Sequence, residues 1–373
     1  MGNLRIAQLA NFIGPTSGGL RRAVDRLGRG YVGAGCARLL ILPGPRDGIV
    51  EDATGVTVTI ASPVVSGGYR LVLGLRSVTE ILDRFRPTSV EVSDKWTLTV
   101  AARWARQRGV GSVLFSHERL DDMASLFLRR DVTRSVRWLN GRLARRYDRV
   151  VVTTNYSARE WEGTAAEVVR VPLGVDLEAF SPLSEPLPPA ETLRLVHVGR
   201  LSREKSPSLA VATAVELDHR GRSVRLDVFG TGPHIDELLS IADGSPIFFH
   251  GYSDDRSAIA TAYRRADICL SVCPAETFGL AVLEGLACGT PVVTADQGGA
   301  FELVASDCAE WADPDPVFLA DAVERLAARR VADPVGLQEA ARARAERYPW
   351  SSTVALMLAV HEEVAGPQAV GRR

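Results

Sequence analysis

The chain has 373 residues, of which 46% are hydrophobic and 24% are charged, and its formal net charge is −1. This composition excludes a fibrous or disordered protein and predicts a globular one with material for two hydrophobic cores. No run approaches the roughly eighteen apolar residues of a membrane span, and Met1–Ala10 lacks a charged segment before a long apolar one, which predicts a cytoplasmic protein.

The first predicted elements are an apolar strand, a glycine-rich loop and a helix. Arg5–Ala10 predicts a buried strand, and Leu20–Tyr31 shows apolar residues at helical spacing. Between them, Gly18 and Gly19 would let the backbone approach a ligand closely, as at a phosphate site. The loop matches neither the dinucleotide fingerprint nor the Walker loop. A plain turn is the alternative interpretation.

Apolar strands then alternate with helical stretches. Strands are predicted at Arg38–Leu42, Val56–Ile60, Ser89–Val92, Ser112–Phe115, Arg149–Thr153 and Val168–Val171. The alternation predicts a parallel, doubly wound α/β sheet, in which ligands lie at the carboxyl ends of the strands. His117 follows one such end and is therefore a candidate for chemistry, with a structural histidine as the alternative.

The basic residues of the chain are concentrated in its first half. Residues 1–172 contain 26 basic and 16 acidic side chains, whereas residues 173–373 contain 18 and 29, so an anionic partner is expected for the first half. Eight arginines lie between Arg129 and Arg149, where apolar residues recur at helical spacing. This pattern favours either a helix near anionic lipid headgroups or a solvated helix that packs on the sheet. No nucleic-acid-binding module accompanies it, so nucleic acid is not expected as a partner.

A proline-rich stretch divides the chain. Ser181–Ala190 carries four prolines, which is typical of a linker. We therefore predict a first Rossmann-like domain at residues 1–180 and a second at residues 181–350. Residues 351–373 are expected to form a helix that packs back on the first domain, followed by a frayed tail.

The second half restarts with a strand at Leu193–Val198, and two cations follow its end. Arg200 and Lys205 lie where a diphosphate would bind, and each cation–phosphate hydrogen bond would contribute about 1.5–3 kcal/mol. Lys205 is the only lysine of the acidic half, which favours a specific role over a solvated surface charge.

Further strands, each followed by a turn of glycine or small residues, predict four turns that converge on one crevice. The four strands are Val224–Phe229, Ile247–His250, Ile268–Val272 and Val292–Thr294. The third turn holds Glu276 and leads into a helix that carries Glu284 and ends near Gly289. Unpaired N–H groups at the start of this helix, near Phe278 and Gly279, suit a diphosphate, while the two carboxylates could accept sugar hydroxyl protons. Two solvated glutamates on a strand–loop–helix are the alternative.

Taken together, these motifs resemble glycosyltransferase family 4, the retaining enzymes of the two-domain GT-B architecture, in which two Rossmann-like domains face a central crevice. The matching pieces run through the chain in order: Gly18-Gly19, His117, Gly199 to Lys205, Gly230 to Pro233, Gly251-Tyr252, Glu276 to Glu284 and Gly298 to Glu302. A closer resemblance is to the GDP-mannose-dependent phosphatidylinositol-monomannoside α-(1→6)-mannosyltransferases. It is carried by the stretches Asn11–Leu20, Glu91–Asp94 and Ser116–Asp121.

The resemblance implies a role for each site residue. Arg200 and Lys205 would hold the donor diphosphate, Glu276 would bond the mannose hydroxyls, and His117 would contact the transferred sugar or the incoming hydroxyl. These four form the implied catalytic set. Glu284 would bond the ribose, Gly19 would let its loop close over the β-phosphate, and the amides of Phe278, Gly279 and Leu280 would assist. The implied donor-binding set is Gly18, Gly19, Arg200, Lys205, Ser253, Asp255, Glu276, Thr277, Phe278, Gly279, Leu280 and Glu284, with Ser253 and Asp255 near the base.

The implied reaction is retaining transfer of mannose from GDP-mannose to a phosphatidylinositol mannoside in glycolipid biosynthesis. Cations and helix amides would stabilise the departing diphosphate, so no metal or other cofactor is expected. The sequence agrees, because no paired-aspartate motif stands beside the donor site and the five cysteines lack zinc-site spacing.

The implied partners are a nucleotide sugar, a lipid-linked acceptor and an anionic membrane surface contacted by the basic first domain. Peripheral association with the inner face of the cell membrane is therefore expected. Three alternatives stay open: a glycosyltransferase with another nucleotide sugar or acceptor, a nucleotide-sugar 2-epimerase of the same fold, and a catalytically silent nucleotide-sugar binding protein.

Overall fold

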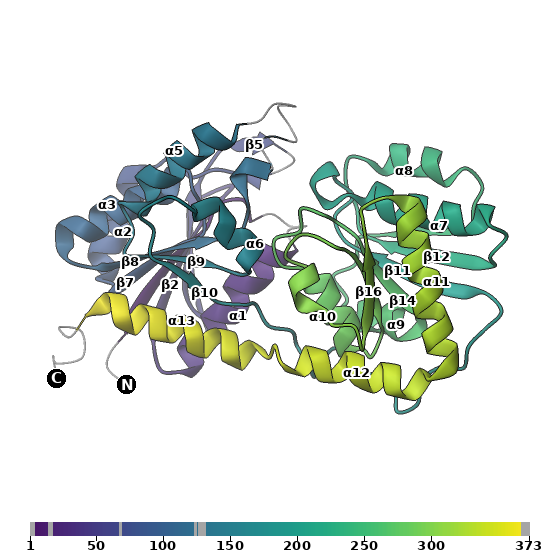
Figure 1. Ribbon diagram of the computed structural model, residues 1–373. Helices are drawn as coiled ribbons and strands as arrows, with labels where there is room; N and C mark the ends of the chain where they lie inside the picture. The colour runs from purple at the N-terminus through teal and green to yellow at the C-terminus, as the bar shows by residue number, and fades with distance from the viewer. Residues whose placement is uncertain (1–3, 14–17, 67–68, 123–124, 126–131, 367–373) are drawn as a thin grey trace. The chain divides into compact units, whose positions relative to one another are not determined.

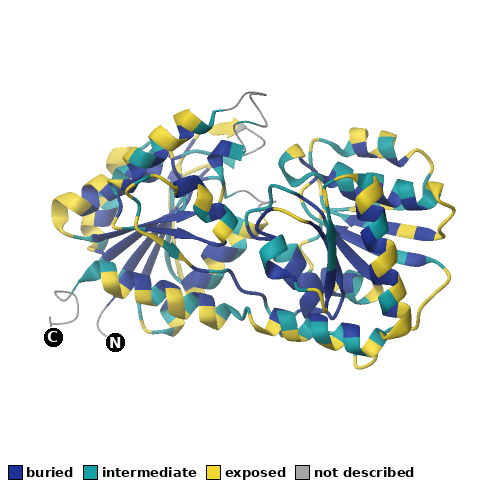
Figure 2. Ribbon diagram, in the orientation of Figure 1, coloured by how far each residue is buried: buried dark blue, intermediate teal, exposed yellow. Residues whose placement is uncertain are grey.

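The chain forms two compact α/β units. The computed structural model describes residues 4–13, 18–66, 69–122, 125 and 132–366. One unit comprises Met1–Pro172 with Trp350–Arg373, and the other comprises Leu173–Pro349 (Figure 1). In each unit the strands of a central sheet form the buried interior and exposed residues gather on the surrounding helices and loops (Figure 2).

The first unit is built on an eight-stranded sheet with the order β10-β9-β8-β7-β1-β2-β4-β3. Neighbouring strands run parallel except at the edge, where β3 pairs antiparallel with β4. Central strands β7 and β8 are buried along their whole length, as expected for a sheet covered on both faces. The strands are β1 (Arg5–Leu9), β2 (Ala37–Gly44), β3 (Gly48–Asp52), β4 (Gly55–Ala61), β7 (Ser89–Val92), β8 (Gly111–Ser116), β9 (Arg149–Val152) and β10 (Val168–Arg170), with a separate hairpin of β5 (Val64–Ser66) and β6 (Tyr69–Arg70).

Helices cover this sheet. They are α1 (Gly19–Gly33), α2 (Leu75–Phe85), α3 (Val100–Arg108), α5 (Thr133–Ala144), the single turn α6 (Asn155–Ala158) and α13 (Trp350–Ala365), with 3-10 turns η1 (Thr97–Thr99) and η2 (Arg159–Trp161). Helix α2 shows why such segments fold as they do: Val78 and Leu82, four residues apart, are buried on one face, and Arg86 ends the helix with a left-handed φ of 53°.

Helix α13 returns from the far end of the chain to pack against α1, β7 and β8. Its approach is close, because a Cβ added at Gly30 of α1 would lie 2.3 Å from Val354 of α13. The predicted tail beyond residue 366 lies outside the described residues.

A buried polar network fixes α13 to the sheet. Glu91 and His361 are both fully buried, and His361 Nε2 lies 3.1 Å from a Glu91 carboxylate oxygen. Tyr31 Oη and Gln8 Nε2 also donate to this carboxylate, at 2.7 and 3.0 Å. Burial disfavours the charged form of Glu91, but the hydrogen bonds and charge of His361, with the other donors, outweigh it and lower the pKa of Glu91.

The second unit is built on a six-stranded parallel sheet with the order β13-β12-β11-β14-β15-β16. Its strands are β11 (Leu193–Val198), β12 (Val224–Phe229), β13 (Ile247–Gly251), β14 (Ile268–Ser271), β15 (Val292–Ala295) and β16 (Ala309–Ala312). Its helices are α7 (Pro207–His219), α8 (Ile235–Ala242), α9 (Arg256–Arg265), α10 (Leu280–Ala287), α11 (Pro316–Ala332) and α12 (Pro334–Glu346), with 3-10 turns η3 (Arg203–Lys205) and η4 (Phe301–Leu303).

These two sheets confirm the predicted doubly wound α/β class, with two differences in detail. The edge strand β3 and the strand β16 were not predicted. In the case of β3, all five residues are exposed and no alternation of apolar residues marks the strand. The predicted domain boundary at residue 180 is also wrong by eight residues, since the second unit begins at Leu173. Residues 173–180, before the proline-rich stretch, belong to the second unit because they pack against it: Val175 pairs with Pro349, and Phe180 is buried against Tyr263.

The basic segment before β9 packs on the sheet in its described part, residues 132–149, while Arg129 and Arg130 lie outside the described residues. Val136 and Leu143 of α5 are buried, whereas Arg134, Arg137 and Trp138 are exposed. The apolar face of α5 therefore belongs to the core, and its cationic face points to solvent. Within the described residues, no helix combines the length and apolar character needed to cross a membrane.

We predict that Glu91→Gln destabilises the first unit by about 3 kcal/mol, since it removes a fully buried carboxylate that accepts hydrogen bonds from Tyr31 and Gln8 and contacts His361. Urea unfolding followed by tryptophan fluorescence measures the loss. Because the pKa of Glu91 is lowered in the folded state, the difference from wild type should persist above about pH 4.3 and shrink as the pH falls below that value. The control is Glu80→Gln, which breaks an exposed ion pair with Arg76 and should change stability by less than about 0.5 kcal/mol. Equal effects of the two substitutions would contradict the prediction.

Candidate functional site

The strand order of the second unit brings the predicted donor residues to one place. The chain proceeds from β11 outward to β12 and β13, then returns to β14 on the other side of β11, so the order reverses between β11 and β14. Ligands of open parallel sheets bind at the carboxyl ends of the strands at such a reversal. The turn after β11 carries Arg200 and Lys205, and the turn after β14 carries Glu276.

An ion pair joins these two turns. Lys205 Nζ lies 3.0 and 2.8 Å from the two carboxylate oxygens of Glu276. The Glu276 side chain is 16% exposed and that of Lys205 is 39% exposed, so the pair sits at the surface of the turn cluster. Burial disfavours the charged form of Glu276, but the charge and hydrogen bonds of Lys205 and the amides of Phe278 and Thr277 outweigh it and lower the pKa of Glu276. The carboxylate is therefore ionised at neutral pH and acts as a hydrogen-bond acceptor.

The start of α10 is formed by an unusual backbone turn. Gly279 precedes the helix with φ 103° and ψ 60°, a conformation that favours glycine, and a Cβ there would lie 3.1 Å from Ala300. Its carbonyl accepts from the amides of Val282 and Leu283. The predicted phosphate-binding amides thus lie at a true helix start, with the Phe278 and Thr277 amides already bonded to the Glu276 carboxylate.

Hydrogen bonds connect the neighbouring turns along this edge of the sheet. The Gly199 amide donates to Phe229 O, and the Gly230 amide donates to Gly251 O. On the other side of β11, Cys273 Sγ lies 3.2 Å from Glu204 O and the Gly299 amide donates to Glu276 O. The predicted convergence of the turns is therefore observed within the second unit.

Arg200 follows the same strand as Lys205 but has a different acidic neighbour. Its guanidinium is 3.6 Å from the carboxylate of Glu204, which also accepts from Ser202 Oγ at 2.6 Å. Glu204 was not singled out from the sequence, although its spacing of four residues from Arg200 was a usable signal.

The remaining predicted donor residues have different environments. Glu284 is buried on α10, where its charge helps to raise the pKa values of Cys269 and Cys288, after burial itself. Asp255 is exposed and caps α9 by accepting from the Ser257 amide, and its own amide donates to Ser253 Oγ. Asp255 thus has a structural task as a helix cap, whatever ligand contact it makes.

The first unit has a comparable reversal, between β1 and β7. Asn11 follows β1 and donates to Asp94, which follows β7, at 2.7 Å. Gly18 and Gly19 lie at the start of α1 and are exposed, while residues 14–17 of the same loop lie outside the described residues.

His117 follows β8, two strands from β1 in this sheet. Its Nε2 lies 3.3 Å from Ser93 Oγ, and its ring centroid is 3.9 Å from that of Phe115. Burial lowers the pKa of His117 to about 4, with a smaller opposing effect from Glu91 and a reinforcing one from Lys95. The imidazole is therefore neutral at physiological pH and can donate or accept a hydrogen bond.

Among the described residues, no group of three or more His, Cys, Asp or Glu side chains is arranged to hold a metal ion. The four buried cysteines, Cys269, Cys273, Cys288 and Cys308, are unpaired, and burial raises their pKa values, to about 11 for Cys273.

Known protein families match both units of this chain. The family described as "Glycosyl transferase 4-like domain" matches residues 18–174, and that described as "Glycosyl transferases group 1" matches residues 192–329. A protein of Mycobacterium tuberculosis (strain ATCC 25177 / H37Ra), named GDP-mannose-dependent alpha-(1-6)-phosphatidylinositol dimannoside mannosyltransferase, is 39% identical over 99% of this chain and 98% of its own length. D-inositol 3-phosphate glycosyltransferase 2 of Catenulispora acidiphila is 34% identical over 56% of this chain and 54% of its own.

Solved structures share the fold at low sequence identity. Sucrose-phosphate synthase from Thermosynechococcus elongatus superimposes with a TM-score of 0.76 at 20% identity, covering 97% of this chain and 99% of its own. Anabaena HepE in complex with UDP and glucose gives a TM-score of 0.74 at 18% identity, with 96% and 98% covered. These neighbours confirm the GT-B architecture predicted from the sequence.

We predict that the His117 imidazole titrates near pH 4 and stays neutral throughout the range in which the protein is active. Because its folded pKa lies below that of an unfolded histidine, about 6.5, its contribution to stability is present above pH 6.5 and lost as the pH falls toward 4. Two-dimensional NMR of the histidine side chains, with His117→Gln to identify the signal, measures the value. Titration near 6.5 would show that the ring is solvated and would contradict the lowered pKa.

Proposed function

We propose that this chain, which belongs to the group 1 glycosyltransferases and is a hexosyltransferase of GT-B architecture, transfers mannose from GDP-mannose to a phosphatidylinositol mannoside. The observation that carries the proposal is the Lys205–Glu276 pair at the strand reversal of the second unit. It places a cation for a diphosphate beside a carboxylate for sugar hydroxyls, in a chain that matches a GDP-mannose-dependent relative over almost its whole length.

The acceptor step is the finer part of the proposal. The sequence motifs predicted the monomannoside as acceptor, whereas the relative from Mycobacterium tuberculosis is named for the dimannoside. Both are phosphatidylinositol mannosides and present sugar hydroxyls on an anionic lipid. We therefore propose this class of acceptor, and the two members are compared directly in the assay below.

In the proposed reaction the bond between mannose C1 and the β-phosphate oxygen breaks, and its electron pair leaves with GDP. The acceptor hydroxyl attacks C1 from the face that the diphosphate leaves, which retains the configuration. The departing phosphate oxygen lies beside that hydroxyl and can take its proton. Lys205, Arg200 and the amides at the start of α10 stabilise the charge that develops on the diphosphate.

The carboxylates hold the donor and transfer no proton in this scheme. Glu276 is ionised and accepts hydrogen bonds from mannose hydroxyls, and Glu284 is proposed to accept from the ribose. Ser253 and Asp255 are proposed to contact the base. Neutral His117 contacts the transferred sugar or the acceptor hydroxyl.

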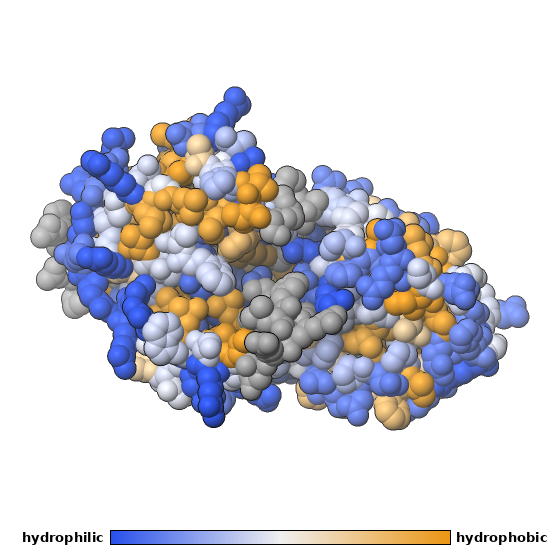
Figure 3. All heavy atoms as spheres, turned by 90° about the horizontal axis from the view of Figure 1, so that it is seen from above, coloured by the Kyte–Doolittle hydropathy of each residue, from blue (hydrophilic) through white to orange (hydrophobic). Residues whose placement is uncertain are grey.

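The exposed face of α5 supports the proposal of an anionic membrane surface as partner. Arg134, Arg137 and Arg142 are exposed there, and the Arg142 guanidinium lies 4.9 Å from the ring of Trp138, which is 64% exposed. Figure 3 views the molecule from the side on which α5 and β5 lie, and apolar residues gather among hydrophilic ones on that face of the first unit. Arginine with an exposed tryptophan suits the headgroup region of a bilayer.

Transfer activity tests the proposal. Incubation with GDP-mannose and purified mono- or dimannoside should yield a product one mannose larger, and Lys205→Ala should lower kcat by about a hundredfold, since it removes charge stabilisation of the leaving group. Arg203→Ala is the matched control, because Arg203 is an exposed cation on the same turn and has no proposed ligand contact. No transfer from GDP-mannose combined with turnover of UDP-glucose would refute the donor. A change of sugar configuration without acceptor would identify an epimerase.

Since cations and amides are proposed to stabilise the leaving diphosphate, activity should be insensitive to metal removal. Transfer rates measured after dialysis against EDTA, with and without added Mg²⁺ or Mn²⁺, should agree within about twofold, whereas a metal-stabilised leaving group would lose several kcal/mol of stabilisation. Loss of activity that Mn²⁺ restores would refute this part of the proposal.

Membrane contact through α5 should depend on its arginines. In flotation with vesicles containing phosphatidylinositol, Arg134→Glu/Arg137→Glu should reduce the bound fraction several-fold, because each basic residue near an anionic surface contributes about 1 kcal/mol. The control Arg222→Glu/Arg265→Glu changes the net charge equally with exposed arginines of the second unit. Equal binding of both variants would place the contact elsewhere.

A further inference from the structure

A buried ion pair lies beneath the loop that carries His117. Lys95 follows β7, and Glu160 lies on η2 after β9, so each comes from a strand end next to that of β8. Lys95 Nζ is 2.5 Å from Glu160 Oε2, and the two side chains are 6% and 1% exposed. Lys95 is also the only lysine of the first 172 residues, the same signal that singled out Lys205.

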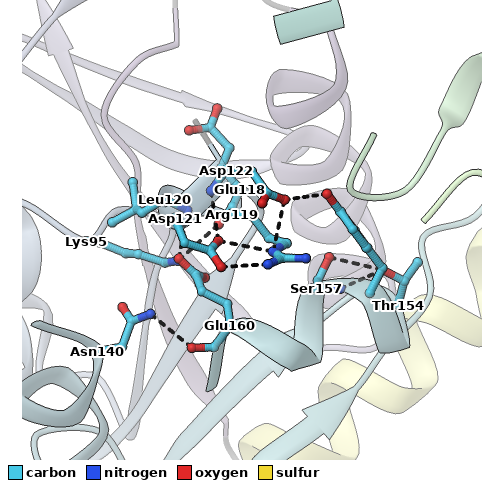
Figure 4. Close-up of polar contacts among 11 residues, drawn as sticks. Lys95, Glu118, Arg119, Leu120, Asp121, Asp122, Asn140, Thr154, Ser157 and Glu160 are labelled. Carbon is cyan, nitrogen blue, oxygen red and sulfur yellow. Dashed lines mark hydrogen bonds and ion pairs between the residues drawn. The ribbon is translucent and has the colours of Figure 1, made fainter. Parts of the chain in front are cut away.

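Both members of the pair also hold the backbone after β8. Lys95 Nζ donates to Glu118 O at 3.0 Å, and the Leu120 amide donates to Glu160 Oε1 at 2.7 Å (Figure 4). The residue immediately before these contacts is His117, whose ring lies against Ser93, two residues before Lys95. The loop is therefore attached at consecutive points to the neighbouring strand ends.

A second group of contacts closes the far end of the same loop. Arg119 donates to both carboxylate oxygens of Asp121, at 3.1 and 2.6 Å, and lies 3.1 Å from Asp122. Tyr156 Oη donates to Asp122, and the Arg119 guanidinium stacks 4.4 Å from the Tyr156 ring. Figure 4 shows the contacts of Arg119 with Asp121 and Asp122 next to those of Lys95 and Glu160, so both groups of contacts hold the same short segment.

Stability alone is a weak reason for a buried lysine in this place. Burial disfavours the charged form of Lys95 and lowers its pKa, although Glu160 opposes the change. Buried ion pairs can often be replaced by apolar residues of similar volume without loss of stability. An apolar pair could not donate a hydrogen bond to Glu118 O, because this bond needs a donor group at the end of a side chain as long as that of lysine.

We propose that Lys95 and Glu160 are positioning residues for His117, which hold its loop against the ends of β7 and β9 so that the imidazole meets the reacting sugar in one fixed orientation. The inference rests on the proposed function in one respect, the contact of His117 with the transferred sugar or the acceptor hydroxyl. The attachment of the loop by the pair stands on the geometry alone.

The test uses the full chain and a paired replacement. Lys95→Met alone leaves a buried unpaired carboxylate and is expected to fold poorly, so the informative variant is Lys95→Met/Glu160→Gln, which removes both charges and keeps an acceptor for the Leu120 amide. The matched control is Arg108→Met/Asp83→Asn, which removes an ion pair of 2.7 Å on α2 and α3 of the same unit. Thermal unfolding of all three establishes which variants are folded.

Kinetics and NMR then give separate outcomes. In the Lys95→Met/Glu160→Gln variant, kcat should fall between about tenfold and a hundredfold, as for a misplaced reacting group, while KM for GDP-mannose stays within about twofold. The His117 ring signals should lose the ring-current shift caused by Phe115, and their titration midpoint should rise as Lys95 is removed and water enters. The control should show neither change.

Either readout can overturn the proposal. A folded Lys95→Met/Glu160→Gln variant with wild-type kcat, or one with lower stability but unchanged His117 signals, would show that the pair is only structural. If the wild type transfers no sugar, the proposed function fails, but the His117 signals still decide whether the pair holds the loop.

Discussion

Parallel pairing of strands is the constraint on which the rest of this structure depends. It places the carboxyl ends of all the paired parallel strands at one edge of each sheet, so turns far apart in sequence become neighbours. In the second unit this joins Lys205 to Glu276, seventy-one residues later, across the reversal between β11 and β14. In the first unit the same rule joins Asn11 to Asp94 across the reversal between β1 and β7.

Pairs of ionisable side chains perform different tasks according to their burial. Glu91 with His361 is fully enclosed and attaches the last helix to the first sheet, and Lys95 with Glu160 is almost as deep and attaches a loop. Lys205 with Glu276 is more exposed, at 39% and 16%. In the proposed function this pair exchanges part of its mutual contact for the donor. Its exposure suits that role, because a fully desolvated pair could be separated only at a large cost in free energy.

The chemistry proposed for this glycosyltransferase separates holding the donor from stabilising its leaving group. Ionised Glu276 suits sugar hydroxyls but is a weak base, since its pKa is lowered. In the proposed reaction, Lys205, Arg200 and the amides of Gly279 and Leu280 stabilise the charge that develops on the diphosphate. His117, kept neutral by burial, can contribute a directed hydrogen bond without adding a charge beside a cationic transition state.

The sequence by itself determined most of the strands, their alternation with helices, the family, and the identity of Lys205 and Glu276, which meet at the turns after β11 and β14. These follow from apolar runs, glycine positions and charged residues next to strand ends, which are local features. Only the tertiary structure decided that Phe180 and its neighbours join the second unit, that the apolar face of α5 is buried, and that Lys95 reaches Glu160 and Glu118 O. Those outcomes depend on which surfaces pack together over long sequence separations. A local sequence pattern does not indicate which distant segment a residue will contact.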